Sequence, residues 1–208
     1  MGIHKLRRAL AGACLLVLVG CSSPAPGFPV AAETSVTSEV STSSPAPSTG
    51  APSTTRPSVQ RPAPINLSQV DICQVVAALP RRKFGLDDDR PPLGGRSLLF
   101  PGSLDCSASG IDTNASMLAV AVTNRDAPSY VDSANVTAKT DGVAAGYPMT
   151  VLTPRNPDTC IAVVDVHDGQ MLYVSYGTPK SGTRPVQPQP QLCGTVAEIA
   201  TAAVGLMR

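Results

Sequence analysis

The spacing of hydrophobic and polar side chains predicts a helix near each end of residues 67–208. Behind a capping residue at Asp71, apolar side chains recur at i, i+3, i+4 and i+7 until Pro80 interrupts the pattern. These side chains are Ile72, Val75, Val76 and Leu79. After the helix breakers Pro188 and Pro190, apolar positions step by four and by three. They are Leu192, Val196, Ile199, Ala203 and Leu206.

Between these helices, the alternation of polar and apolar residues is typical of β-strands. We predict strands at residues 97–107, 117–124 and 147–152, and a hairpin at residues 160–176. The segment 128–139 is ambiguous, and we favour a helix there that uses Tyr130, Val131, Ala134 and Ala138. The pattern as a whole indicates an α+β fold, an antiparallel sheet with the N- and C-terminal helices packed on one face.

The hairpin is the clearest β signal, since its two apolar runs meet at Asp168-Gly169, a dipeptide favoured in two-residue turns. Such a turn pairs His167 with Gln170 and Val164 with Tyr173. One face then carries Cys160, Ala162, Val164, Val166, Met171 and Tyr173, and the other carries Ile161, Val163, Leu172, Val174 and Tyr176 beside Asp165 and His167. Because both faces are largely apolar, we expect the hairpin in the interior of the sheet.

The N-terminus has the organisation of a bacterial secretory signal. Basic residues precede an apolar run at positions 9–19, which is about half the length that a bilayer-spanning helix needs. The sequence Leu18-Val19-Gly20-Cys21 resembles the lipobox of bacterial lipoproteins, whose cysteine thiol receives a diacylglyceryl group. We predict a signal peptide at residues 1–20 and a lipid anchor on Cys21, which holds the protein on the extracytoplasmic face of the plasma membrane.

We predict that residues 21–66 form a disordered tether between this anchor and one domain at residues 67–208. Positions 22–66 hold nine Pro, ten Ser and six Thr, so they bury too little apolar surface to fold. The Ser/Thr/Pro richness leaves two interpretations open, an O-glycosylated stalk and an unmodified spacer.

Four cysteines fall within the predicted domain: Cys73, Cys106, Cys160 and Cys193. An even number in an exported chain indicates disulfides, and four cysteines allow three connectivities. Two of them lie near the starts of the terminal helices and two in β segments, so we favour the pairs Cys73–Cys193 and Cys106–Cys160. A zinc site is the competing interpretation, but the chain has no CxxC pair and the compartment is oxidising.

The net charge and the candidate catalytic residues exclude some functions and identify none. Lys and Arg number 16 against 15 for Asp and Glu, with no basic stripe, which excludes nucleic acid as a partner. His167, flanked by Asp165 and Asp168, is the one candidate for catalysis, yet beside a tight turn an exposed polar role is the simpler interpretation. No G-x-S-x-G marks a serine nucleophile. We predict no catalytic residue, no metal site and no cofactor.

Three further groups have a structural and a functional interpretation. Arg81, Arg82 and Lys83, followed by Asp87, Asp88 and Asp89, favour a solvated charged loop over a calcium or partner site. The isolated Gly94-Gly95 gives almost no support for a phosphate cradle. The tyrosines can line a ligand pocket, but core positions are favoured in so aromatic-poor a domain; they are Tyr147, Tyr173 and Tyr176.

The positions of the cysteines resemble those of a known protein family. The lipobox and the tether are followed by cysteines in Leu104-Asp105-Cys106, Thr159-Cys160-Ile161 and Leu192-Cys193-Gly194. The whole chain is similar to the actinobacterial, especially mycobacterial, cell-envelope lipoproteins grouped as a domain of unknown function. Many members carry an aromatic residue two positions after the second domain cysteine, where this chain has Ala108. The resemblance implies an α+β domain outside the plasma membrane and brings no catalytic residues.

We therefore expect a non-enzymatic envelope lipoprotein that binds a protein partner or a cell-wall component. The alternative is a carrier or sensor of an apolar small molecule or lipid held between sheet and helices. The small residues Ala197, Ala200, Ala202 and Ala203 on the last helix suggest it. A hydrolase that uses His167 is the third hypothesis.

Replacement of Cys21 with alanine is expected to abolish lipidation, because it removes the thiol that accepts the diacylglyceryl group. The variant should leave the detergent phase of a membrane extract, as measured by phase partition and by the mass of the mature protein. Cys14→Ala is the control, since Ala11 stands where a lipobox needs a large aliphatic residue. Unchanged partition of the Cys21 variant would contradict the lipobox interpretation.

Overall fold

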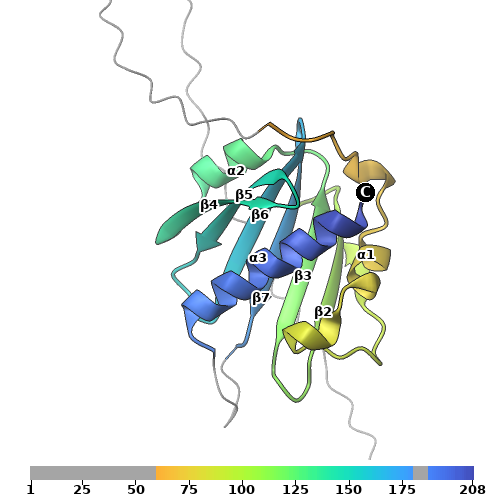
Figure 1. Cartoon of the computed structure of the whole chain (residues 1–208), viewed down its shortest axis with the longest axis vertical. Coiled ribbons are helices and arrows are strands. Elements are labelled where there is room, and N and C mark those ends of the chain that lie inside the picture. The colour runs from red at the N-terminus through yellow and green to blue at the C-terminus, as the bar shows by residue number, and fades with distance from the viewer. Residues whose placement is uncertain (1–59, 180–186) are drawn as a thin grey trace, which may run out of the picture. The chain divides into compact units, whose positions relative to one another are not determined.

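The computed structural model describes residues 60–179 and 187–208, so the signal peptide, Cys21 and the tether up to residue 59 lie outside the described residues. The described chain forms a seven-stranded antiparallel sheet in the order β1-β2-β3-β7-β6-β5-β4 (Figure 1). The strands are β1 (Leu93–Arg96), β2 (Leu104–Ser109), β3 (Ser116–Val122), β4 (Ala138–Ala144), β5 (Tyr147–Thr153), β6 (Thr159–His167) and β7 (Gln170–Gly177). The helices are α1 (Ile72–Ala78), α2 (Ala127–Ser133) and α3 (Gln189–Leu206), with short 3-10 turns at Leu67–Gln69 and Arg81–Phe84.

Both terminal helices pack on one face of the sheet, as predicted (Figure 1). Helix α1 contacts β1, β2 and β3, whereas α3 contacts β4, β5, β6 and β7. The Asp71 carboxylate caps α1 by accepting hydrogen bonds from the backbone N–H groups of Cys73 and Gln74. Helix α3 begins at Gln189, so Pro190 lies within its first turn, where a missing N–H costs nothing. Leu206 ends α3 and is exposed rather than buried.

The opposite face of the sheet has a smaller core under α2. Its aromatic centre is Phe100, Tyr130 and Tyr173, with ring centroids 5.2 to 5.9 Å apart. The helix predicted within residues 128–139 is shorter than expected: it ends at Ser133, and Ala138 instead begins edge strand β4. Hydrophobic spacing did not predict β4, because six of its seven residues are exposed.

The disulfide pairing predicted from the sequence is wrong. The bonds are Cys73–Cys106 and Cys160–Cys193, each with a sequence separation of 33 residues. Each bond joins a terminal helix to a strand beneath it, α1 to β2 and α3 to β6. The helices do lie on the same face, but each covers its own half of the sheet, so their cysteines meet strands rather than each other.

In the central hairpin, the predicted turn is confirmed and the predicted strand register is wrong. His167 pairs with Gln170 across Asp168-Gly169, as predicted. A β-bulge between Asp165 and His167 then shifts the strands by one residue, so Tyr173 pairs with Val163 instead of Val164. Leu172, Val174 and Tyr176 consequently share the helix-covered face with Cys160, while Met171 and Tyr173 face α2. The prediction that both faces are buried is confirmed, since β6 and β7 lie inside the sheet.

The strand predicted at residues 97–107 begins only at Leu104. Pro101 and Gly102, at φ +87°, form a turn instead, and strand β1 lies before this turn. Strand β1 contains Gly94-Gly95, and a Cβ built on Gly94 would lie 2.5 Å from the Sγ atom of Cys73. The glycine pair therefore has a packing role, because Gly94 makes room for the Cys73–Cys106 disulfide against the edge strand.

Non-reducing peptide mapping is expected to recover Cys73 linked to Cys106 and Cys160 linked to Cys193. Removal of the second bond by a Cys160→Ala, Cys193→Ala double substitution should lower the free energy of unfolding by roughly 3–4 kcal/mol, because it reopens a long loop of the unfolded chain. Denaturant titration measures this loss. A peptide that links Cys73 to Cys193 would contradict the arrangement of helix and strand.

Candidate functional site

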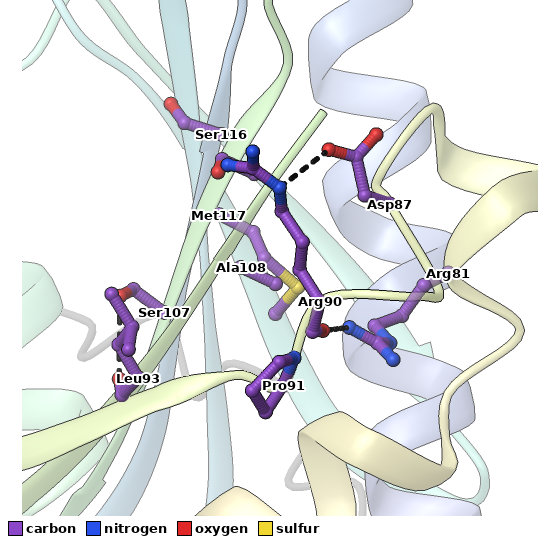
Figure 2. Close-up of a pocket in the computed structure, with 10 residues that line it drawn as sticks. Arg81, Asp87, Arg90, Pro91, Leu93, Ser107, Ala108, Ser116 and Met117 are labelled. Atoms are coloured by element: carbon purple, nitrogen blue, oxygen red, sulfur yellow. Dashed lines mark hydrogen bonds and ion pairs between the residues drawn. The ribbon is translucent and has the colours of Figure 1, made fainter. Parts of the chain in front are cut away.

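A hollow of about 460 Å³ lies beside edge strand β1, between the sheet and the loop at residues 87–91. Figure 2 shows it with Arg90 standing between the loop and the strands. Its lining residues are Arg81, Asp87, Arg90, Pro91, Leu93, Ser107, Ala108, Ser109, Ser116 and Met117. A hollow of this volume falls within the range of small-ligand sites and equally admits one side chain of a partner.

The wall of the hollow is held by Arg81, which is only 7% exposed. Its guanidinium donates hydrogen bonds to the carbonyl oxygens of Arg90, at 2.6 Å, and Asp88, at 2.7 Å. Its Nε lies 3.9 Å from the Asp88 carboxylate and forms no hydrogen bond. The sequence placed Arg81 in a solvated loop, and that expectation is wrong, because its planar fork of donors fixes two loop carbonyls. Arg82 and Lys83 are exposed, as expected.

Arg90 is the accessible cation of the hollow. Its side chain is 59% exposed, and its Nε lies 3.8 Å from the Asp87 carboxylate. The same Asp87 oxygen accepts a hydrogen bond from the backbone N–H of Ile111, so Asp87 is shared between two partners. Figure 2 shows the Arg90 guanidinium reaching toward Ser116. An exposed guanidinium with a long, shared ion pair remains able to bind an incoming carboxylate.

The floor of the hollow is apolar. Ala108 and Met117 are buried and face each other across β2 and β3. Pro91 and Leu93 complete the apolar lining, and Leu93 is 73% exposed at the start of β1. Position 108, where the family resemblance leads one to expect an aromatic residue, carries the methyl group of Ala108 in the floor of the hollow.

The polar side chains that line the hollow are those of two arginines, one aspartate and three serines. Among the lining residues, three serines carry hydroxyls, and Ser107 donates its hydrogen bond to the carbonyl oxygen of Leu93 at 3.3 Å. No histidine lines the hollow, and His167 lies at the opposite end of the sheet, where β6 ends.

Strand β1 also presents an open edge. It is the terminal strand of the sheet, and all four of its residues are exposed. The outer backbone N–H and C=O groups of such a strand have no ladder partner within the described residues, and they can pair with another extended chain. The hollow thus lies next to a free sheet edge.

His167 does not form a triad with its flanking carboxylates. Its Nδ1 donates to the carbonyl oxygen of Asp168 at 2.7 Å, while Arg61 forms ion pairs with the carboxylates of both Asp165 and Asp168. The hydrogen bond from Arg61 lowers the pKa of Asp168. Burial raises the pKa of Asp165; Arg61 opposes this effect, and the charges of Asp168 and Asp126 add to it. The cluster fastens residue 61 to the hairpin tip.

The remaining candidates have structural roles. The tyrosines are buried, as favoured, and Tyr147 and Tyr176 donate hydrogen bonds to the carbonyl oxygens of Ala63 and Phe84. The Ala63 contact means that the chain packs on the domain before residue 67. Ala200 and Ala203 are buried against the sheet, and their small size lets α3 approach β6 and β7 closely.

Within the described residues, no group of three or more His, Cys, Asp or Glu side chains is arranged to hold a metal ion. In the same residues, none of the helices has both the length and the apolarity to cross a bilayer. The sequence pointed to Arg81 and Asp87 only as loop charges, and it missed Arg90 and Leu93. The Pro91-Pro92 pair before Leu93 was the available signal, since it ends a loop at the start of an extended segment.

Substitution of His167 with alanine is expected to change thermal stability by less than about 0.5 kcal/mol, because its ring is partly exposed and bonds only a neighbouring carbonyl. The biological phenotype should stay close to that of the wild type. Circular dichroism melting and complementation of a deletion strain measure the two outcomes. Loss of function with an intact fold would instead support a catalytic histidine.

Comparison with known proteins adds a family but no activity. No curated protein and no solved structure matches the chain. A family model described as "Protein of unknown function (DUF3558)" matches residues 16–206. This match covers the β1 edge, the hollow and both disulfides, and the chain therefore belongs to the DUF3558 family of proteins of unknown function.

Proposed function

We propose that this protein is a non-enzymatic lipoprotein of the actinobacterial cell envelope, which is anchored through Cys21 and binds an extended segment of a partner protein along strand β1. The observation that carries the proposal is the open β1 edge beside the hollow of Arg90. When a peptide adds to a sheet, main-chain hydrogen bonds to the edge strand provide affinity. Pockets beside the strand provide specificity for the side chains of the peptide.

The composition of β1 favours strand addition. Natural edge strands are commonly protected by charged side chains, proline or a bulge. In β1, Gly94 and Gly95 present no side chain that would keep a partner backbone away, and the one charged residue is Arg96 at its end. Leu93 adds exposed apolar surface at the point where the strand meets the hollow.

The lining of the hollow indicates the chemistry of the partner segment. The floor of Ala108 and Met117 suits one apolar side chain, and Arg90 suits a carboxylate at the mouth. We therefore expect an extended segment in which an apolar residue is adjacent to an acidic residue or to a C-terminal carboxylate.

Two observations support the proposed location. Both disulfides require a compartment that keeps thiols oxidised, such as the outside of the plasma membrane. The lipobox at Leu18–Cys21 supplies the anchor, and the proposal takes its membrane attachment from that motif.

A carrier of an apolar small molecule between sheet and helices has less support. Val196, Ile199 and Ala200 on α3 are each 0% exposed and belong to one packed cluster with side chains of β6 and β7. A closely packed core leaves little space for a ligand at that position.

Selection of binders from a displayed library of random 12-residue peptides tests the proposal. Selected peptides should alternate apolar and polar residues and carry an acidic residue. In NMR titrations of the full mature chain, they should shift the amide signals of Leu93, Gly94, Gly95 and Arg96. Arg90→Glu should weaken binding roughly tenfold, because it places a carboxylate against a carboxylate.

Arg155→Glu is the matched control, since Arg155 is exposed in the turn between β5 and β6 and makes the same charge change. It should leave the affinity within about twofold. Peptides that shift amides elsewhere, or that bind the Arg90→Glu and Arg155→Glu variants equally well, would contradict strand addition at β1.

A further inference from the structure

The loop between β1 and β2, residues 97–103, exposes two consecutive leucines. Leu98 is 98% exposed and Leu99 is 52% exposed. We propose that these two residues, the leucine tip, insert into the headgroup region of the bilayer to which the chain is anchored. The inference rests on the proposed anchor at Cys21 and adds a second, non-covalent membrane contact made by the folded domain.

The leucine tip is held out by a network of hydrogen bonds within the loop. The Ser97 backbone N–H donates to the Ser103 carbonyl at 2.9 Å, and the Ser103 N–H donates to the Phe100 carbonyl at 3.0 Å. The Phe100 N–H donates to the Ser97 hydroxyl at 3.1 Å. The Asn124 side chain donates to the Pro101 carbonyl at 2.9 Å. A loop bonded in this way exposes its apolar side chains in a fixed position.

Phe100 anchors the loop to the sheet. Its ring is 6% exposed and packs against Tyr130 and Tyr173, with centroid separations of 5.5 and 5.2 Å. Phe100 occupies this small core, whereas Leu98 and Leu99 of the same loop stay exposed. The exposure of the two leucines is thus built into the fold, and exposed apolar residues held in this way mark a contact surface.

The leucine tip lies at the end of the sheet where the chain from Cys21 enters the domain. Strand register places Arg96, Leu104 and Ala121 side by side at this end, next to Leu172 near the start of β7. Strand β7 follows the hairpin tip at Asp168, and Arg61 forms its ion pair with that residue. Figure 1 shows the first described segment passing the tip of the β6–β7 hairpin.

The position of the leucine tip at the end of the sheet where the anchored chain enters favours the bilayer as the surface that it contacts. Two strand spacings, about 10 Å, separate β2 from β7, so the leucine tip and the hairpin tip that contacts Arg61 lie at the same end of the sheet. A lipid anchor on Cys21 makes insertion an intramolecular event, and a weak contact then becomes effective. The bilayer is consequently the apolar phase that this end of the domain meets at high effective concentration.

Basic side chains border the leucine tip. Arg96 directly precedes the loop, and the Arg125 guanidinium lies 5.0 Å from the ring centre of Tyr130, the partner of Phe100. Asp126, next to Arg125, accepts hydrogen bonds from Ser129 as the cap of α2. Exposed leucines with arginines in the adjoining segments match the boundary between acyl chains and anionic headgroups.

Tryptophan fluorescence tests the inference directly, because the chain contains no tryptophan. The mature chain that carries Leu98→Trp is bound to vesicles of phosphatidylcholine with phosphatidylglycerol, once through native lipid on Cys21 and once through an N-terminal histidine tag on nickel-chelating lipid. Emission should shift to the blue, and lipids brominated on the acyl chain should quench it by roughly half in both preparations.

Ile111→Trp is the matched control, since Ile111 is 44% exposed in the loop between β2 and β3, at the other end of these strands. Its emission should be the same with and without vesicles. Equal emission from Leu98→Trp with and without vesicles, while sedimentation shows the protein bound, would overturn the leucine tip. Absence of lipid on Cys21 by mass spectrometry would overturn the anchor instead, and the tagged preparation still tests the tip.

Discussion

Helices α1 and α3 are each tied by a disulfide to the strand beneath them, and the bond of α1 determines which residue the edge strand β1 can carry. The Cys73–Cys106 bond draws α1 down onto β2 and brings the Cys73 sulfur against β1. Only a residue without a Cβ fits under that sulfur, so β1 carries glycine at position 94. The disulfide that fastens α1 to β2 therefore also requires a residue without a side chain at position 94 of β1.

The same half of the molecule contains the hollow. Arg81 is buried and donates hydrogen bonds to the carbonyl oxygens of Asp88 and Arg90, which fixes the loop that forms one wall of the hollow. Arg90 in turn points outward, with Asp87 as a distant and shared partner. In the proposed function, the buried arginine would keep the wall of the hollow rigid, and the exposed arginine at its mouth would bind the carboxylate of the partner.

The hollow and the leucine tip lie at opposite ends of the strands. The hollow adjoins Ser109 of β2 and Ser116 of β3, whereas the leucine tip adjoins Leu104 and Val122, at the other ends of the same strands. A domain that rests its leucine tip on the membrane would therefore direct the hollow away from the lipid. In that orientation, a partner side chain can enter the hollow from the side that faces away from the bilayer.

The sequence by itself determined the features that depend on neighbouring residues. The spacing of Ile72, Val75 and Val76 and the cap at Asp71 define α1, and Asp168-Gly169 places the turn of the central hairpin. These signals are local, because hydrogen bonding in a helix or a tight turn involves residues only a few positions apart. The apolarity of both hairpin faces likewise predicted its interior place in the sheet.

Only the tertiary structure decided the features that depend on distant residues. One bulged residue before His167 shifts β7 against β6, and this register sets which side chains face α3. The pairing of Cys73 with Cys106 depends on where α1 lands on the sheet, and the burial of Arg81 depends on the loop that folds over it. Such contacts form between segments far apart in the chain, so no spacing within the sequence specifies them.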